Sequence, residues 1–489
     1  MSNDKKLVIK CEEENDEHPH CPHGPTLLFY YQDKGLQQGY YACSAHRDKK
    51  TCSFHLPVAE LTEKHLRRRC YDAPTAEYRN LRKRFRHNDG NEQRHFCHSC
   101  NLPLLDTELT QHNGHSLVRN LSKQFLQDPT LFLRPLENDK VQAQYFFDNK
   151  ALQFFEKCFK DLQINKVLCI GAPRLHAHLR NTCSSAIKSF LLDFDQRFYY
   201  FFKDTHFAWF NMCNNYFFDK KQKKKFHKFL LCDDTERLLI FTDPPFGCRT
   251  EPIANTLHQI TCLYNKTNAL PHQPLPIFWI FPYFSAHYIQ KLMPELQMCD
   301  YKVNYTNHLA YSDGLRARKL GSPVRIFTNV PLERLLLPIA EEYKYCRKCV
   351  KYTALENRHC AKCNECPARN GSTYRHCNLC GVCVKPYYVH CRSCRRCTQA
   401  EGHNCQEYQA RQRCWICLQE GHTENHCSVW QKRRRIQGRT GKDDLQQAAA
   451  VIRCLLCGAK GHNERRCRQR QTFVEEATFL SETQLKFRV

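Results

Sequence analysis

A run of four residues carries chemistry suited to an aromatic amine. Directly after the apolar run 238–242 come Asp243, Pro244, Pro245 and Phe246. A residue before proline adopts extended geometry and two prolines in series fix the backbone, so the Pro244 carbonyl can point toward the same atom as the Asp243 carboxylate. These two acceptors would hold an exocyclic amine while Phe246 stacks on its ring. We interpret the run as an active site for methyl transfer to an amine, with a plain turn after a strand as the alternative.

The composition indicates a partner that carries negative charge. The 489 residues include 74 Lys and Arg against 49 Asp and Glu, which gives a formal net charge of +25. Cationic side chains neutralise phosphates and release the counterions around a nucleic acid. If the acceptor amine belongs to an adenine, that base must be unpaired or flipped, because a base stacked in a duplex cannot reach a closed pocket. We therefore expect a nucleic-acid substrate.

The sequence shows neither a membrane span nor a secretion signal. Its longest apolar stretch, 275–284, is interrupted by Pro276 and Pro282 and is shorter than the ~20 residues that cross a bilayer. The first residues are polar and then acidic, unlike a signal peptide. We expect no membrane contact and an intracellular, reducing location.

The 33 cysteines are spaced as zinc ligands rather than as disulfide partners. Most recur as C-x-x-C pairs near histidines, and disulfides are rare in a reducing compartment. Residues 346–405 alone hold twelve cysteines and four histidines, enough for four tetrahedral sites. Two ligands from one repeat and two from the next give four interleaved sets: Cys346, Cys349, His359 and Cys366; Cys360, Cys363, His376 and Cys383; Cys377, Cys380, His390 and Cys397; and Cys391, Cys394, His403 and Cys405.

This cysteine-rich array resembles the zinc-binding part of the DHHC palmitoyltransferases. The resemblance is restricted to the metal ligands, because the sequence has neither the Asp-His-His-Cys tetrad nor a membrane span. The last set departs from the spacing of the others at His403 and Cys405. The array has few apolar runs, so we expect it to fold by binding metal. A purely structural scaffold and a scaffold that also contacts RNA both remain open.

Two units further along match the zinc knuckle, a module that binds single-stranded nucleic acid. Each has the spacing C-x2-C-x4-H-x4-C. The basic run 432–435 between them suits phosphates, and Trp415 offers a stacking face. Protein recognition is the alternative. The ligands are Cys414, Cys417, His422 and Cys427, and Cys454, Cys457, His462 and Cys467.

Two zinc fingers are predicted near the N-terminus. The first resembles the GRF-type finger in its Cys-Pro-His-Gly run at 21–24, although Tyr40 stands where that family has arginine. The second has C2H2 character with a short spacing between its histidines. Their ligands are Cys21, His23, Cys43 and Cys52, and Cys97, Cys100, His112 and His115. The basic stretches 67–69 and 82–86 between the fingers are interpreted as a solvated helical face, with RNA contact as the alternative.

The middle of the chain alternates apolar runs with helix-length segments, which is typical of a doubly wound sheet. Its predicted strands are 166–170, 190–195, 238–242, 277–281, 300–306 and 323–330. Ligands of such sheets bind at the carboxyl ends of the strands. Gly171, Asp193 and Asp243 each stand at one such end, so we expect them on a common edge.

The same edge is predicted to hold a nucleotide-like cofactor. The strand-to-helix turn consists of Gly171, Ala172, Pro173 and Arg174, where a single glycine is also compatible with a plain loop. Asp193 and Asp195 follow about 20 residues later, where an acid holds a ribose hydroxyl. Gln144 and Tyr145 resemble the Q-Y element that amino-methyltransferases place over the methionine part of S-adenosylmethionine, and an ordinary amphipathic segment is the alternative.

The whole assembly resembles the zinc-knuckle N6-adenosine methyltransferases of large-subunit ribosomal RNA. The resemblance covers roughly residues 18–470 and depends on the domain order, D-P-P-F at 243–246, G-A-P-R-L at 171–175 and N-M-C-N-N-Y-F-F at 211–218. A second complete knuckle departs from the family pattern. The resemblance implies S-adenosylmethionine as donor, Asn211 in the donor pocket, structured ribosomal RNA as substrate and ribosome-biogenesis proteins as further partners. It also implies action in the nucleus and nucleolus, with the cytoplasm as an additional site.

The predicted fold class is α/β, a Rossmann-like class I methyltransferase domain flanked by small zinc-finger domains. The ligands suffice for eight zinc ions: one in each N-terminal finger, four in the array and two in the knuckles. The predicted domains are an acidic tail 1–17, a GRF-type finger 18–60, a basic segment with a C2H2-like finger 61–125, a methyltransferase domain 126–338, a DHHC-like array 339–408, two knuckles 409–470 and a C-terminal tail 471–489.

Two rival functions are compatible with the same sequence. One is a zinc-rich RNA-binding protein whose methyltransferase-like domain is inactive, and it predicts RNA binding without donor binding. The other keeps the chemistry but changes the acceptor to DNA adenine or a protein amide; the knuckles argue against DNA because they prefer single strands.

Overall fold

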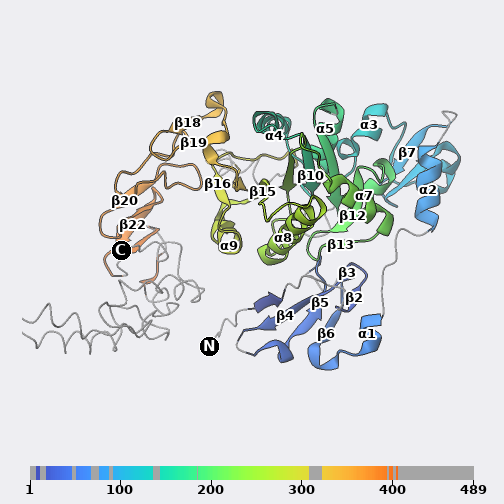
Figure 1. Ribbon diagram of the computed structural model, residues 1–489, viewed down its shortest axis with the longest axis horizontal. Helices are drawn as coiled ribbons and strands as arrows, with labels where there is room; N and C mark the ends of the chain where they lie inside the picture. The colour runs from blue at the N-terminus through green and yellow to red at the C-terminus, as the bar shows by residue number, and fades with distance from the viewer. Residues whose placement is uncertain are drawn as a thin grey trace, which may run out of the picture. The chain divides into compact units, whose positions relative to one another are not determined.

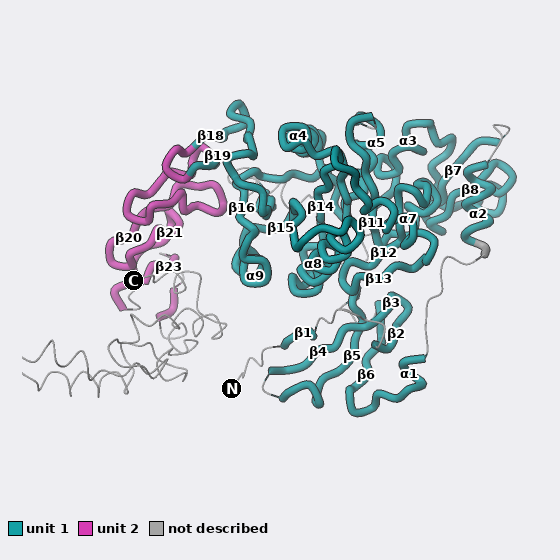
Figure 2. The backbone as a smooth tube through the Cα atoms, in the orientation of Figure 1, with its two compact units in different colours: residues 1–345, 350–354 teal, residues 346–349, 355–489 magenta. Residues whose placement is uncertain are grey.

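The computed structural model divides into two compact units, residues 1–345 with 350–354 and residues 346–349 with 355–489 (Figure 2). The described residues are 7–10, 18–32, 34–46, 51–67, 76–87, 92–135, 144–183, 185–307, 322–393, 396–399 and 403–405. Both predicted knuckles and Cys394 of the array lie outside this part of the chain.

An eight-stranded sheet forms the centre of the first unit (Figure 1). Its strands lie in the order β13-β12-β11-β10-β14-β15-β17-β16. The bounds are β10 Lys166–Ile170, β11 Lys188–Asp193, β12 Phe207–Asn211, β13 Tyr216–Phe217, β14 Leu238–Thr242, β15 Ile277–Pro282, β16 Gln297–Cys299 and β17 Val324–Thr328. The five strands β10, β11, β12, β14 and β15 run parallel, and β13, β16 and β17 pair antiparallel with their neighbours. This sheet confirms the Rossmann-like class I methyltransferase fold.

One predicted strand is wrong and two strands were missed. The strand expected at 300–306 is instead β16, three residues that end at Cys299. From there the Asp300 carboxylate accepts a hydrogen bond from the Ala354 N–H at 3.2 Å, and Tyr305 pairs with Phe147 only as an isolated bridge. The chain therefore leaves the sheet although its apolar pattern continues. The missed strands are β12 and β13, which extend the sheet beyond β11.

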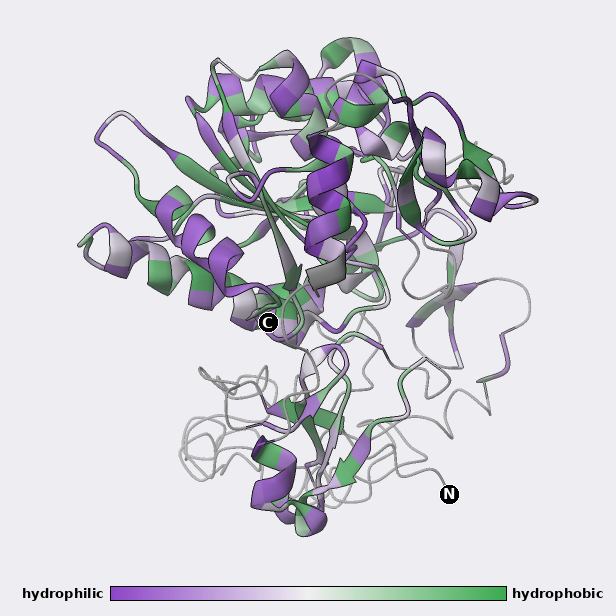
Figure 3. Cartoon of the chain, turned by 90° about the vertical axis from the view of Figure 1, so that its right-hand side faces the viewer, coloured by the Kyte–Doolittle hydropathy of each residue, from purple (hydrophilic) through white to green (hydrophobic). Residues whose placement is uncertain are grey.

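Helices cover both faces of the central sheet, as Figure 1 shows. One face packs on α4 (Asn149–Asp161), α5 (Pro173–Thr182) and α6 (Phe198–Phe201), and the other on α7 (Lys220–Leu230), α8 (Thr250–Thr267) and α9 (Ala286–Leu292). Two separate apolar cores result. The strands are buried and mostly hydrophobic, whereas the helices alternate hydrophobic and hydrophilic residues (Figure 3). This alternation is expected of helices that pack by one face.

Two small sheets hold the N-terminal fingers. The first finger contains the sheet β1-β4-β5-β6 (Leu7–Lys10, Leu27–Tyr31, Tyr40–Ala42, His55–Pro57), the hairpin β2-β3 (His20–Cys21, Gly24–Pro25), the 3-10 turns Leu36–Gln38 and Val58–Glu60, and α1 (Glu63–Arg67). The second contains the sheet β8-β7-β9 (Leu102–Leu105, Arg94–Cys97, Leu117–Val118), the 3-10 segment Asp106–His112 and, after it, α3 (Lys123–Gln127) and a 3-10 turn Pro129–Leu131. Phe96 and Leu105 of the second finger belong to the core beside α4 and α5, so this finger packs directly on the central domain.

Two arginines between the fingers are structural. In α2 (Ala76–Arg86) the Arg82 guanidinium lies 2.7 Å from the Asp204 carboxylate and 4.0 Å from the centre of the Tyr199 ring. Arg86 donates to the carbonyls of Phe201 and Phe202, both at 3.0 Å. These carbonyls end α6, where a helix lacks partners of its own. The interpretation of 82–86 as a solvated face is therefore wrong for Arg82 and Arg86.

Short hairpins follow the central domain. Two 3-10 turns, Leu332–Arg334 and Ile339–Glu341, lead to the pair β18 (Tyr343–Cys346) and β19 (Lys351–Ala354). The second unit repeats the hairpin with β20 (Arg375–Cys377) and β21 (Val382–Val384), then β22 (Tyr388–Cys391) and β23 (Arg396–Gln399). Its small core consists of Cys380, Val382, Val384 and Cys397. None of the helices in the described ranges has the length and apolar content needed to span a membrane.

Candidate active site

Two backbone hydrogen bonds join the carboxyl ends of β10, β11 and β14. The Gly171 N–H donates to the Leu192 carbonyl at 2.9 Å, and the Asp243 N–H donates to the Ile170 carbonyl at 3.0 Å. Since β11 and β14 lie on opposite sides of β10, chain connections leave this point in opposite directions. Open α/β sheets bind ligands at such a switch point. Gly171, Asp193 and Asp243 meet here in one pocket, as the strand ends predicted.

Position 171 requires glycine, because both its backbone conformation and the space around it exclude a side chain. Its φ is +65°, a left-handed conformation, and an added Cβ would lie 2.6 Å from Met212 Cε and 2.9 Å from the Asp243 carbonyl. A side chain would push the ends of β10 and β14 apart. The single glycine is therefore a requirement of close strand packing as well as of the turn.

The pocket collects residues from distant parts of the first unit. They come from the first finger, the segment before α4 and the ends of β10, β11, β12 and β14. The lining residues are Ala45, His46, Thr51, Gln144, Tyr145, Gly171, Asp193, Phe194, Asp195, Asn211, Met212, Cys213, Asp243, Pro244, Pro245, Phe246 and Cys248. All four predicted catalytic residues are among them, as are Gln144, Gly171, Asp193, Asp195 and Asn211 from the predicted donor set.

Three predicted donor residues do not line this pocket. Ala172 and Pro173 are buried at the start of α5. Arg174 Nη1 lies 2.8 Å from Asp128 Oδ2 and 3.1 Å from Thr130 Oγ1, in a largely buried ion pair. The sequence placed Arg174 at the donor because it follows the glycine turn. The first turn of α5 instead directs its side chain to the segment after the second finger.

Arg197, which the sequence did not suggest as a site residue, forms an ion pair with one of the three acids of the pocket. Arg197 contacts Asp195 from Nε at 2.9 Å and from Nη2 at 2.7 Å, and the pair is almost fully buried. Gln144 Nε2 donates to the same carboxylate at 3.4 Å. Asp193 Oδ1 accepts the Asp195 N–H at 2.8 Å, but burial and the neighbouring Asp195 charge raise the pKa of Asp193 to about 8. A positive ligand near Asp193 would favour its ionised form.

The Asp-Pro-Pro-Phe corner brings a carboxyl group and an aromatic ring into the pocket. Asp243 lines the pocket, and burial raises its pKa well above the usual value for an aspartate. The Cys248 N–H donates to the Pro245 carbonyl at 2.8 Å, which closes the turn. The Phe246 ring stacks on Tyr145, with centroids 5.5 Å apart and an angle of 28° between the planes. An aromatic pair therefore stands next to the carboxyl group.

The first finger is joined to this pocket by two asparagines. Asn211 Nδ2 donates to the His23 carbonyl at 3.0 Å and to Ser44 Oγ at 2.9 Å. Asn214 Nδ2 donates to the Pro25 carbonyl at 2.6 Å and to Ser44 Oγ at 2.9 Å. Asn211, predicted to hold the donor, lines the pocket but uses its amide nitrogen to hold the finger.

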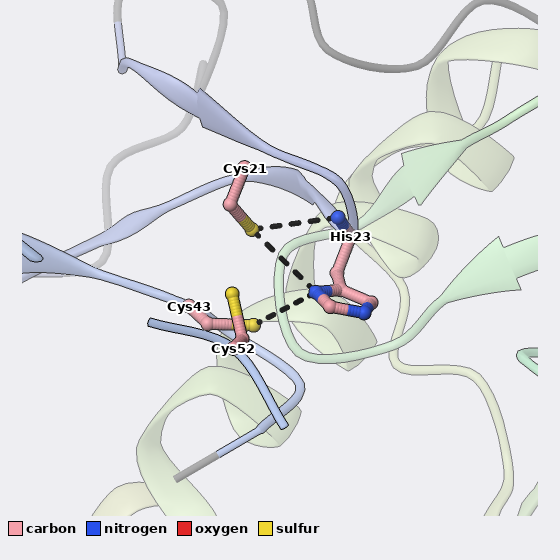
Figure 4. A group of neighbouring side chains, drawn as sticks. All are labelled: Cys21, His23, Cys43 and Cys52. Atoms are coloured by element: carbon pink, nitrogen blue, oxygen red, sulfur yellow. Dashed lines mark hydrogen bonds between the residues drawn. The ribbon is translucent and has the colours of Figure 1, made fainter. Parts of the chain in front are cut away.

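The ligands of the first finger have the geometry of a zinc site (Figure 4). Cys21, His23, Cys43 and Cys52 point toward one another, and their ligand atoms all lie within 4.8 Å. His23 Nδ1 is 3.4 Å from Cys43 Sγ and 3.9 Å from Cys21 Sγ. Tetrahedral zinc with its usual bond lengths separates two ligand atoms by roughly 3.6–3.8 Å. Zinc therefore fits this site.

The second finger and three array sets satisfy the same test. Each of the four brings its ligand atoms within 4.8 Å of one another, and in each array set the Sγ atoms of one cysteine pair are 3.7 Å apart. The sets are Cys97, Cys100, His112 and His115; Cys346, Cys349, His359 and Cys366; Cys360, Cys363, His376 and Cys383; and Cys377, Cys380, His390 and Cys397. The interleaved pairing of ligands is therefore supported at three consecutive positions.

The fourth array set is only partly described. Cys391 Sγ lies 3.5 Å from Cys405 Sγ, and His403 Nδ1 lies 3.3 Å from Thr398 Oγ1. The fourth predicted ligand, Cys394, lies outside the described residues. This set and the two knuckles stay predictions.

Several residues in or beside the pocket gave no usable signal in the sequence. Ala45, His46 and Thr51 belong to the first finger, and their place in the wall depends on how the finger docks. Tyr305 donates a hydrogen bond to Asp243 Oδ1 at 2.9 Å from 62 positions away. Asn214 lies within the N-M-C-N-N-Y-F-F motif at 211–218, and its place in that motif was the one sequence signal that could have marked it as a site residue.

The Asp-Pro-Pro-Phe corner, the glycine turn and the acids at one sheet edge define an N6-adenine methyltransferase. Residues 138–331 match the family model described as "Probable N6-adenine methyltransferase". The chain is 39% identical over 369 residues to the human (Homo sapiens) protein "rRNA N(6)-adenosine-methyltransferase ZCCHC4", with 72% of each chain covered. It is 37% identical over 367 residues to the Xenopus laevis protein of that name, covering 72% of this chain and 75% of the relative. The chain belongs to this family of rRNA N6-adenosine methyltransferases.

The finger-to-pocket contacts predict that the first zinc site supports donor binding. In Cys52→Ser one zinc ligand is lost, and the wall at Ala45 and His46 loses its anchor. We expect the purified protein to lose about one zinc ion per chain and its affinity for S-adenosylmethionine to fall on the order of 10-fold, because the wall must be ordered on binding. Metal analysis and titration calorimetry measure both. Cys262→Ser, a cysteine outside every zinc set, is the control, and equal donor affinity in all three proteins would contradict the prediction.

The ligand sets also predict the metal content. Plasma mass spectrometry of the full-length protein should find eight zinc ions per chain, the sum of two fingers, four array sites and two knuckles. Chelation should release them together with loss of the folded array, because structural zinc contributes on the order of 10 kcal/mol to such modules. A content near four would show that the interleaved pairing is wrong.

Proposed function

We propose that this chain transfers a methyl group from S-adenosylmethionine to N6 of one unpaired or flipped adenosine in large-subunit ribosomal RNA. The observation that carries the proposal is the meeting of Asp243, Phe246, Gly171 and Asp193 in one pocket at the switch point of the sheet. Family membership supports the reaction class and the RNA substrate.

The donor would lie between the glycine turn and the acids of β11. Gly171 leaves room for a close approach to the backbone, and Asp193 stands where an acid holds ribose hydroxyls. Gln144 and Asp195, held by Arg197, form the adjoining wall. When bound, S-adenosylmethionine supplies an electrophilic methyl carbon on a positive sulfonium. The acidic wall suits that charge.

The acceptor amine would be held by the Asp-Pro-Pro-Phe corner. Asp243 and the Pro244 carbonyl accept from the N6 hydrogens and direct the nitrogen lone pair toward the methyl carbon. Phe246 stacks on the purine, and its partner Tyr145 is placed to cover the opposite face after a small opening of the pair. Methyl transfer leaves one proton to be lost from N6, which Asp243 or solvent accepts. Positioning of the two reactants supplies ~7–11 kcal/mol of such a barrier, so orientation is the main contribution.

The zinc-rich modules and the positive charge would bind the structured RNA around the target. Six exposed lysines lie on α7, which contains no acidic residue: Lys220, Lys221, Lys223, Lys224, Lys225 and Lys228. Phe218, just before this helix, lies 6.0 Å from the pocket residue Phe194 between ring centroids. Backbone phosphates near the flipped base would therefore meet the lysines.

With ribosomal RNA as substrate, we infer that the protein acts in the nucleolus and nucleus and additionally in the cytoplasm, beside ribosome-biogenesis proteins.

The assignment predicts that Asp243→Ala abolishes turnover without unfolding the protein. Loss of a group that holds the reacting amine should lower the rate by about 10²–10³-fold or more. The measurement is transfer of labelled methyl to total RNA followed by nucleoside analysis for N6-methyladenosine. Asp234→Ala, on an exposed loop, is the control and should retain full activity with the same thermal unfolding. Normal methylation by Asp243→Ala would remove the active-site assignment, and RNA binding without donor binding by the unchanged protein would favour the inactive rival.

The lysines of α7 predict a change in the salt dependence of RNA binding. Each phosphate contact contributes ~0.7–0.9 to the slope of log K against log salt. Lys224→Gln with Lys228→Gln removes two charges from one face, so we expect the slope to fall by roughly 1.4–1.8. The matched control is Lys157→Gln with Lys160→Gln on α4, where both lysines pair with acids of their own helix. Equal slopes for the two double variants would show that α7 does not contact RNA.

A further inference from the structure

The Asp243 carboxyl group is held by a tyrosine that does not itself line the pocket. The Tyr305 hydroxyl donates to Asp243 Oδ1 at 2.9 Å. Tyr305 follows β16 in a stretch without regular structure, and its side chain is 8% exposed. The hydrogen bond therefore links the Asp-Pro-Pro-Phe corner to the segment after β16, whose described residues contribute nothing to the pocket wall.

Tyr305 is itself fixed on two sides. Its ring stacks on Phe147 with centroids 5.0 Å apart and 23° between the planes, and the two residues form an isolated β-bridge. The next residue, Thr306, donates its N–H to the Phe146 carbonyl at 2.8 Å. Tyr145, directly before these phenylalanines, is the residue that stacks on Phe246. The segment 145–147 therefore contacts both Tyr305, which binds Asp243, and Phe246 of the Asp-Pro-Pro-Phe corner.

This hydrogen bond decides which oxygen of Asp243 faces the substrate. With Oδ1 engaged by Tyr305, the other oxygen is the acceptor left for the pocket. Burial favours the neutral acid, and a protonated carboxyl would offer an O–H to an amine that needs an acceptor. A donor to Oδ1 stabilises the ionised form and opposes rotation of the carboxylate.

We propose that Tyr305 is a positioning residue for methyl transfer, which holds the Asp243 carboxyl group by one oxygen so that the other can accept from the N6 amine. The inference depends on the proposed function, since it requires Asp243 to hold the reacting amine. Tyr305 acts through Asp243 and touches neither substrate.

The pH dependence has a defined sign. Activity should be lost as the pH falls through the pKa of Asp243, because the protonated acid cannot accept from the amine. Removal of the Tyr305 hydroxyl should raise that pKa further, so the acid limb of the kcat profile should move to higher pH. The other titratable groups around Asp243 are Tyr145, which neighbours Tyr305, and on the remaining pocket walls His46, Asp193, Asp195, Cys213 and Cys248.

The test compares Tyr305→Phe with Tyr301→Phe in the full-length protein. Tyr301 is buried four positions earlier, where its ring stacks on Phe154 at 3.7 Å, away from Asp243. Both variants lose one enclosed hydroxyl group. For Tyr305→Phe we expect kcat to fall roughly 10- to 100-fold, as for loss of a hydrogen bond to a charged group, with the donor KM unchanged and the acid limb shifted upward. For Tyr301→Phe we expect a kcat and pH profile like those of the unchanged protein.

Three further readouts separate positioning from general damage. Donor affinity by calorimetry and the thermal unfolding temperature should be alike in Tyr305→Phe and Tyr301→Phe. In an Asp243→Asn background, Tyr305→Phe should cause no further loss of whatever turnover remains, because Tyr305 acts only through the carboxyl group. A wild-type kcat and profile in Tyr305→Phe, or parallel loss of donor affinity and folding, would overturn the inference while leaving the proposed function standing. Absence of N6-methyladenosine with the unchanged protein would instead overturn the proposed function and the inference with it.

Discussion

The close approach of β10 and β14 is the constraint on which the rest of the site depends. It exists because Gly171 has no side chain: an added Cβ would meet Met212 and the Asp243 carbonyl at less than 3 Å. With the strand ends joined by the hydrogen bond from Asp243 to Ile170, the Asp-Pro-Pro-Phe corner starts at a fixed point. The acids of β11 then face it across the same edge.

The N-terminal fingers belong to the catalytic unit rather than standing apart as appendages. The first supplies pocket wall and is held by the amide groups of Asn211 and Asn214. The second buries Phe96 in the core beside α4, and Asn101 accepts from Arg197 at 3.4 Å, the arginine that compensates Asp195. Since a small finger has too little core to fold alone, zinc bound at the first finger would order the pocket wall as well as the finger itself.

The sequence predicted features that depend on local spacing and missed those that depend on docking. Zinc ligands recur at fixed intervals, and five sets have the expected geometry. Strand ends carry Gly171, Asp193 and Asp243, so their meeting was predictable from strand order. The strand at 300–306 was wrong because apolar periodicity cannot show that the chain leaves the sheet after Cys299. The assignments of Arg174 and Arg82 failed because their partners, Asp128 and Asp204, lie 46 and 122 positions away.

The three acids of the pocket differ in their electrostatic surroundings, and this difference matters for the reaction. Asp195 forms a buried ion pair with Arg197. At Asp193 and Asp243 burial outweighs the opposing effects of Arg197 and of the Tyr305 hydroxyl, and it raises the pKa of both carboxyl groups. A cationic ligand would favour both carboxylates at once. A sulfonium bound beside these acids would favour the ionised form of Asp243, which is the form that can accept from an amine.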